Sequence, residues 1–142
     1  MRLPNGLISG SSYAVSLWLK PEQLTALSTT FFGAKDANSW VSLLPMGHAG
    51  VSGNTMVWSG TNWFDADTGT TIPAGQWSHL VVWIDGQKVV DRTGFPDVFT
   101  TTNGTFSLGV NWWDTPYQGQ MDDLSVYNGP LTDAQVTAFA QR

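Results

Sequence analysis

The sequence lacks cysteine and contains little charge. The absence of cysteine from all 142 residues excludes disulfide bonds and thiolate metal sites. Charged residues make up 12% of the chain, well below the roughly 25% usual for soluble domains. Only six basic residues stand against eleven acidic ones, so the basic footprint of a nucleic-acid-binding protein is missing. No run of 18 apolar residues occurs, and no segment is therefore expected to span a membrane.

Tryptophan and glycine are frequent, with eight and fifteen residues respectively. Hydrophobic residues make up 42% of the chain, and the length suits a single domain with one core over residues 1–142. Many tryptophans and glycines combined with few charges indicate an all-β extracellular module. A surface of this composition favours neutral polar ligands over ions.

Short stretches in which apolar and polar residues alternate predict β-strands along most of the chain. The expected strands are Tyr13–Leu19, Thr30–Ala34, Trp40–Leu44, Thr55–Ser59, Trp77–Ile84, Gln87–Asp91, Thr105–Asn111 and Met121–Tyr127. The strongest hairpin signal is Asp85-Gly86, which lies between two alternating runs. Many short strands with regular turn signals favour a sandwich or a barrel.

One short helix is expected near the end of the chain. Thr132 is a suitable N-cap, and Gln135 lies three residues later, which completes a capping-box pattern. Leu131 and Val136 have the spacing of a hydrophobic staple. The pattern predicts a helix that docks on the edge of the sandwich.

The residues usual in glycosidase or hydrolase active sites are scarce. Glu22 is the single glutamate, and it lies in a turn, so paired glutamates cannot flank a scissile bond. Asp122 and Asp123 are adjacent, and on a strand their side chains would point to opposite faces. The two histidines, His48 and His79, are not accompanied by a Gly-x-Ser-x-Gly nucleophile motif. The sequence therefore predicts a protein without enzymatic activity.

The alternation through residues 105–113 separates two adjacent tryptophans. Trp112 falls on the face of the apolar residues and is expected to continue the core or to cap its end. Trp113 falls on the opposite, polar face, where a sugar ring could stack on its indole. Asn111 and Asp114 lie beside it in the sequence and are candidate hydrogen-bond partners for sugar hydroxyls.

Further aromatic residues are candidates for the same function. Trp58 and Trp63 flank a Gly-Asn turn, and loops of this kind often hold functional residues. Trp40 lies at the start of an expected strand. On the strand over 77–84, His79 and Trp83 share the face opposite the expected core. Core packing is the alternative role for each of these side chains.

Three stretches resemble a known family. The stretch 75–87 (GQWSHLVVWIDGQ), the stretch 106–136 (FSLGVNWWDTPYQGQMDDLSVYNGPLTDAQV) and the stretch 16–21 (SLWLKP) resemble laminin-G-like, concanavalin A-like lectin/glucanase domains. The resemblance implies an all-β, antiparallel jelly-roll β-sandwich, here with a short C-terminal helix. Domains of this kind are often attached to secreted bacterial glycoside hydrolases and commonly bind carbohydrate.

The resemblance also bears on calcium and on oligomeric state. Some members hold one structural calcium ion, and Asp122 lies at the position where related jelly-rolls place a carboxylate ligand. The stretch 64–69 (FDADTG) has an Asp-x-Asp spacing but lacks a distal glutamate, which favours a turn. The N-terminal strand is expected to be short or missing, and the segment 79–91 to be shorter than usual. We expect a monomer within a larger multidomain enzyme, or a strand-exchanged dimer if an edge is unpaired.

The sequence thus predicts a non-catalytic carbohydrate-binding module of a secreted enzyme that degrades plant or algal polysaccharide. Binding would combine stacking on tryptophan with hydrogen bonds from Asn, Asp and His. Two alternatives are a structural or adhesion domain that binds protein partners, and a catalytic jelly-roll glycosidase. The site could lie on the concave face or at the loop rim.

Overall fold

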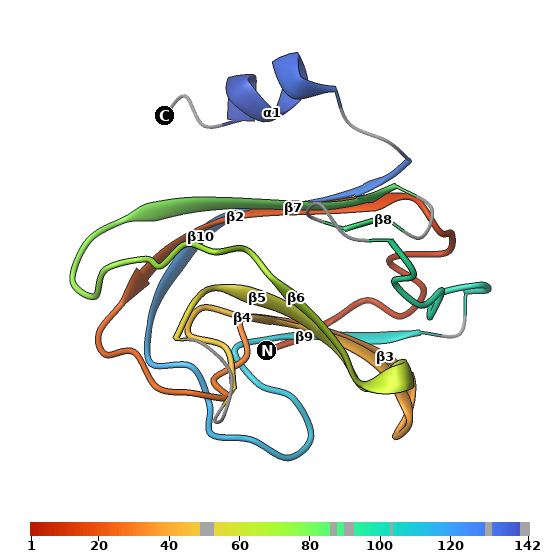
Figure 1. The fold of residues 1–142 in the computed structure, drawn as a ribbon, viewed down its shortest axis with the longest axis horizontal. Coiled ribbons are helices and arrows are strands. Elements are labelled where there is room, and N and C mark those ends of the chain that lie inside the picture. Colours follow the sequence, from red (N-terminus) through yellow and green to blue (C-terminus); the bar gives the residue numbers. More distant parts are fainter. Residues whose placement is uncertain (49–52, 86–87, 90–92, 103, 130–131, 140–142) are drawn as a thin grey trace.

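The chain forms two stacked antiparallel β-sheets and one short helix (Figure 1). The computed structural model describes residues 1–48, 53–85, 88–89, 93–102, 104–129 and 132–139. The six-stranded sheet has the order β1 (Arg2–Leu3), β9 (Thr105–Leu108), β3 (Phe31–Asp36), β4 (Ser39–Leu44), β5 (Met56–Ser59) and β6 (Phe64–Asp67). The four-stranded sheet has the order β10 (Gly119–Asn128), β2 (Tyr13–Pro21), β7 (Ser78–Asp85) and β8 (Lys88–Val89). This architecture confirms the expected antiparallel jelly-roll sandwich.

The expected strands all have counterparts, with differences at their ends. The strand expected over Thr105–Asn111 ends at Leu108, because Gly109 has a φ of +77° and turns the chain out of the sheet. Two short strands were missed. One is the two-residue β1, where a short or missing strand was expected, and the other is β6, where a turn was expected. Residues 87, 90 and 91 of another expected strand lie outside the described residues.

The core lies between the two sheets and follows from strand alternation. On β2, every second side chain from Tyr13 to Leu19 is buried against the opposite sheet. The facing residues on the six-stranded sheet are Phe31, Val41, Leu43, Val57, Ala66, Phe106 and Leu108. Burying each large apolar side chain contributes about 1.5–3 kcal/mol. The side chains on the other face of the six-stranded sheet are therefore not part of this core.

Strand β10 contains a bulge that changes which side chains face the core. Its register against β2 shifts between Asp122 and Ser125, and Asp123 has a φ of 51°. Met121 and Leu124 both pack against the core, although three positions separate them. Asp122 pairs with Trp18 and lies exposed on the outer face. The expectation that Asp122 shares the core-side face of Leu124 is therefore wrong, because it assumed unbroken alternation.

The β7–β8 hairpin and the C-terminal helix match their sequence signals. Asp85 pairs with Lys88 as a hairpin requires, and Gly86 of the predicted turn lies outside the described residues. Helix α1 (Asp133–Phe139) lies over the outer face of the four-stranded sheet, and its described side chains are exposed (Figure 1). The expected docking on the edge of the sandwich is therefore not observed. Its capping box is present, because the Gln135 amide donates to Thr132 Oγ1 at 3.2 Å and the Thr132 amide donates to Gln135 Oε1 at 2.8 Å. The expected staple involves Leu131, which lies outside the described residues.

The helices of the described residues are short. None of them is long and apolar enough to cross a lipid bilayer.

Candidate functional site

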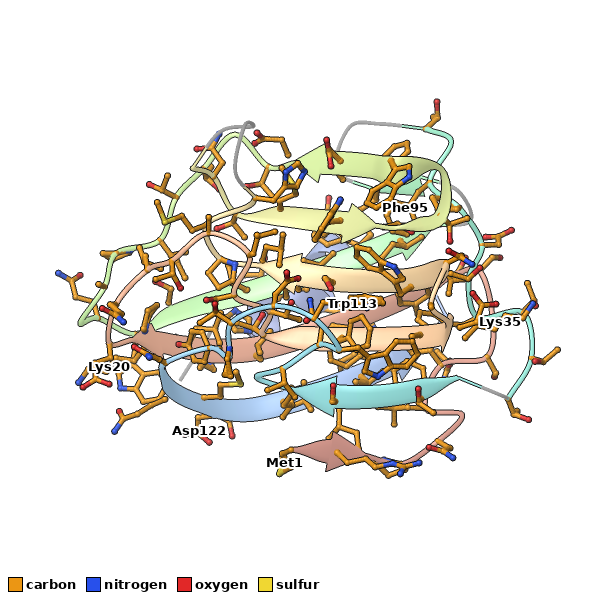
Figure 2. The ribbon with its side chains drawn as sticks, turned by 90° about the horizontal axis from the view of Figure 1, so that it is seen from below. Met1, Lys20, Lys35, Phe95, Trp113 and Asp122 are labelled. Carbon is orange, nitrogen blue, oxygen red and sulfur yellow. The ribbon has the colours of Figure 1, made fainter. Side chains whose placement is uncertain are left out.

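The outer face of the six-stranded sheet holds a cluster of aromatic side chains, which we call the aromatic platform. Alternation on β3, β4 and β5 directs Phe32, Trp40 and Trp58 away from the core. Two loops add three more indoles. The platform is made up of Phe32, Trp40, Trp58, Trp63, Trp112 and Trp113. Figure 2 views this face directly, with Trp113 near its centre.

The base of the platform is buried and tightly packed. Phe32 and Trp40 are 1% and 4% exposed, although both lie on the outer face of their sheet. Their ring centroids are 6.3 Å apart, and Trp40 meets Trp58 edge-to-face at 4.6 Å. The backbone of Gly60 lies against the Trp40 indole, and a Cβ at that position would come within 2.2 Å of the ring. Trp40 and Phe32 therefore form a fixed floor.

Three tryptophans above this floor expose large apolar surfaces. Trp63 is 72% exposed, Trp112 51% and Trp113 52%. The ring centroids of Trp113 and Trp63 lie 5.5 Å and 6.5 Å from that of Trp40. Exposed aromatic side chains gathered on one face usually mark a binding surface.

The side chain of Asn111 holds the loop 109–118 in the conformation that exposes Trp112 and Trp113. Asn111 Oδ1 accepts hydrogen bonds from the amides of Trp113 at 2.9 Å and Asp114 at 2.7 Å. Its Nδ2 donates to Asp114 Oδ2 at 2.5 Å and to Thr29 Oγ1 at 3.1 Å, and Thr29 is buried. This Asx-type arrangement ties the loop to the body of the protein. Because these bonds use both ends of its amide, Asn111 positions the loop.

Trp112 is not part of the core, and the prediction that it is was wrong. Strand β9 ends at Leu108, so the alternation used to place Trp112 does not continue through the loop. The turn at Asn111 instead brings both indoles to the platform, where the rings of Trp112 and Phe32 meet edge-to-face at 5.4 Å. The exposed position expected for Trp113 is correct.

Trp63 occupies an unusual backbone conformation. It ends the short 3-10 helix η1 (Thr61–Trp63) with a φ of 50°, which a bulky residue seldom adopts. Its amide donates to the Gly60 carbonyl at 3.3 Å. Left-handed backbone costs a non-glycine residue roughly 1–2 kcal/mol. Such strain is common at functional sites, and here it accompanies the most exposed tryptophan of the platform.

A histidine and an aspartate border the platform at β6. His48 Nε2 and Asp65 Oδ1 are 2.8 Å apart, and the His48 ring lies 4.8 Å from that of Trp58. Asp65 pairs with Trp58 across β5 and β6, which places the carboxylate on the same outer face. The sequence did not assign His48 or Phe32 to the binding site. The alternation of β3 could have indicated Phe32, whereas no local signal links His48 to Asp65.

His79 and Trp83 lie on the opposite side of the protein from the platform. Their strand places them on the outer face of the four-stranded sheet, where His79 stacks on Trp18 at 5.0 Å and Trp83 is 41% exposed. His79 Nε2 shares a hydrogen bond of 2.8 Å with the Ser16 hydroxyl. Burial lowers the pKa of His79 below its usual 6.5. The predicted residues thus divide between two surfaces, with Trp40, Trp58, Trp63 and Trp113 together on one.

The expected calcium ligand lies apart from any cluster of acidic or histidine side chains. Within the described ranges, no three His, Asp or Glu residues come close enough to hold a metal. Asp122 and Asp123 line one hollow, and Asp122 Oδ1 accepts the amide of Asp123 at 2.8 Å. Calcium takes six to eight oxygen ligands, so backbone carbonyls and water would have to supply most of them. The described side chains alone provide too few oxygen ligands for calcium, and calcium binding at Asp122 stays a prediction.

Comparisons with known proteins agree with this architecture. The model of the concanavalin A-like lectin/glucanases superfamily matches residues 1–137. Among solved structures, the chain is similar to domain 4 of AbnA, a GH43 extracellular arabinanase from Geobacillus stearothermophilus, in complex with arabinotriose. The two sequences are 53% identical, the match covers 99% of this chain and 71% of the other, and the TM-score is 0.91. A search of curated proteins finds no match. On its sequence and its fold, the chain belongs to the concanavalin A-like lectin/glucanase superfamily.

Proposed function

We propose that the protein is a non-catalytic carbohydrate-binding module that takes a neutral oligosaccharide on the aromatic platform. The observation that carries the proposal is the exposure of Trp63, Trp112 and Trp113 above a packed aromatic floor on one face. Sugar rings have apolar faces that stack on indole, and each such contact contributes roughly 1–2 kcal/mol. Micromolar to millimolar affinity requires about 4–8 kcal/mol, which two or three rings and a few hydrogen bonds supply.

The similarity to an arabinanase domain that was solved with arabinotriose supports an arabinose-containing ligand. It also supports an accessory role in a secreted enzyme that degrades plant polysaccharide. Holding the substrate near a catalytic domain raises its effective concentration there. The low charge of the chain fits a neutral glycan better than an acidic one.

The arrangement of carboxylates supports binding rather than catalysis. Hydrolysis of a glycosidic bond uses two carboxyl groups on opposite sides of that bond. Near the platform, Asp65 is paired with His48 and Asp114 is hydrogen-bonded to Asn111. Both carboxylates hold neighbouring side chains in place. A purely structural or adhesion domain would bury its tryptophans, whereas Trp63 and Trp113 are exposed.

Isothermal titration calorimetry with arabinotriose, together with retention gels containing arabinan, xylan, pectin or β-glucan, tests the proposal. We expect binding to at least one arabinose-containing ligand. Trp113→Ala should lower the affinity at least tenfold, which is about 1.4 kcal/mol, with a nearly unchanged Tm because the side chain is half exposed.

Trp83→Ala is the matched control. Trp83 is similarly exposed but lies on the other sheet, so this variant should bind normally. Absence of binding to every glycan would overturn the proposal. Loss of binding in Trp83→Ala but not in Trp113→Ala would move the site to the opposite face.

A further inference from the structure

A hollow of about 340 Å³ lies next to the platform, beyond Trp112. It lies over β1, β9 and β3, at the edge of the face that Figure 2 shows, where Met1 marks the start of β1. Trp112 borders both regions, because it contacts Phe32 on the platform and also lines the hollow. The volume falls at the lower end of the range of small-ligand pockets. The platform and the hollow therefore form one continuous surface.

The register of the sheet aligns this surface across the strands. One row of directly paired residues runs through all six strands on the outer face. From β6 to β1 it consists of Asp65, Trp58, Ser42, Phe32, Ser107 and Arg2. Neighbouring strands lie about 4.8 Å apart, so the row spans roughly 24 Å. Its aromatic members lie in the middle, and the hollow covers its Arg2 end.

The side chains that line the hollow suit a sugar ring. Phe32 and Trp112 provide apolar walls, whereas Thr105, Ser107 and Arg2 provide polar groups. The Ser107 hydroxyl donates to the Val110 carbonyl at 2.8 Å, which leaves its oxygen able to accept a hydrogen bond. Arg2 is exposed and donates to Asn5 at 3.2 Å, and its guanidinium has several further N–H donors. Apolar walls with a few polar groups are typical of sites for small polar ligands.

We propose that this hollow is an additional sugar subsite, so that the surface binds a neutral oligosaccharide longer than three units, laid across the strands from Trp63 to Arg2. This inference rests on the proposed function and extends it. A trisaccharide on the platform leaves the hollow open, and a longer chain fills it. The expected consequence is an affinity that rises with chain length, and a contribution from Thr105, Ser107 and Arg2 to long ligands alone.

Calorimetry with linear arabinotriose and arabinohexaose tests the inference. For the unmodified protein, we expect arabinohexaose to bind about 5- to 30-fold more tightly than arabinotriose. Thr105→Trp should fill the hollow and remove most of that difference while the affinity for arabinotriose stays unchanged. The statistical advantage of a longer ligand persists in this variant, so the comparison isolates the subsite.

Three further variants guard against a folding artefact. Thr105→Val leaves the hollow open and removes one hydroxyl, so it should lose less of the chain-length difference than Thr105→Trp. Arg2→Ala removes an exposed side chain and should reduce that difference, whereas Lys35→Ala, which removes an exposed cation that does not line the hollow, should not.

The outcomes separate the two proposals. If arabinotriose binds but arabinohexaose binds no more tightly, or if Thr105→Trp keeps the full difference, the subsite is wrong and the binding function stands. If neither ligand binds, the subsite is wrong, and the binding function fails as well when the retention gels show no binding to any glycan.

Discussion

The indole of Trp40 lies directly against Gly60, and its Nε1 is 2.2 Å from the position that a Cβ on this glycine would occupy. Gly60 also donates its amide to the Trp40 carbonyl at 3.2 Å. The contact and the hydrogen bond therefore fix the position of the Trp40 indole relative to β5. The backbone of Gly60 has a φ of −70°, which any residue adopts, so only the close contact requires glycine here.

The contact between Gly60 and Trp40 predicts the effect of Gly60→Ala. The added methyl group must displace the Trp40 ring, and overpacking of this kind costs about 1–3 kcal/mol. We expect a lower Tm and a weaker affinity for arabinotriose, measured by differential scanning calorimetry and titration calorimetry. Gly10→Ala is the control, because a Cβ added at this position would have no contact within 4 Å. An unchanged Tm in Gly60→Ala would contradict the predicted clash.

The hydrogen bonds of Asn111 predict that it acts by positioning Trp112 and Trp113. In Asn111→Ala, the amides of Trp113 and Asp114 lose their acceptor, which costs about 1–3 kcal/mol where those groups are left unsatisfied. We expect a loss of sugar affinity together with altered tryptophan fluorescence in the free protein. Asn38→Ala, at an exposed position in the β3–β4 turn, should change neither property. Weaker binding with an unchanged free-state spectrum would instead indicate that Asn111 contacts the sugar directly.

The lowered pKa of His79 predicts that the protein is less stable in acid. Burial disfavours the charged imidazole in the folded state, so the unfolded chain binds a proton more readily. The free energy of unfolding should therefore fall as the pH drops through about 6.5, the usual pKa of the unfolded state. A Tm series from about pH 8 to about pH 5 measures this. His79→Gln should flatten the slope, and an equal slope in both proteins would refute the assignment to His79.

The calcium prediction concerns Asp122. An ion that binds only the folded state stabilises it, by about 2.7 kcal/mol when its concentration is a hundred times the Kd. We expect calcium to raise the Tm, EDTA to reverse the rise, and Asp122→Asn to remove it. Asp133→Asn, which changes an exposed carboxylate in α1, should leave the response intact. A Tm that responds to neither calcium nor EDTA would remove the site.

Residue alternation predicted the sandwich correctly but failed wherever the strand geometry was interrupted. Val15 and Leu17 face the core on β2 as expected, because the strand is continuous there. In β10 the bulge at Asp123 reverses the alternation. The spacing of Met121 and Leu124 is the local sign of that bulge, since two core residues three positions apart cannot share one face of a regular strand.

The aromatic platform could be predicted only in part for a related reason. Strand parity correctly placed Trp113 outside the core and His79 and Trp83 on the side of their strand that faces away from it. Parity could not show that Trp83 lies on the opposite sheet from Trp113, because that depends on the order of strands in space. It also could not place Trp112, whose orientation depends on the turn formed by Asn111.

The platform has a consequence for the order of events in folding. Trp40 and Trp113 are in contact although they lie 73 positions apart in the chain. Contacts between such distant residues form late, because a long loop must first close. Trp40, Trp58 and Trp63 come from one short segment of the chain. The loop that adds Trp112 and Trp113 is hydrogen-bonded to Thr29 and follows β9, so it reaches its position only after β3 has paired with β9. The proposed sugar binding would therefore require the complete sheet, because a partly folded chain would contain all the tryptophans without bringing them together on one surface.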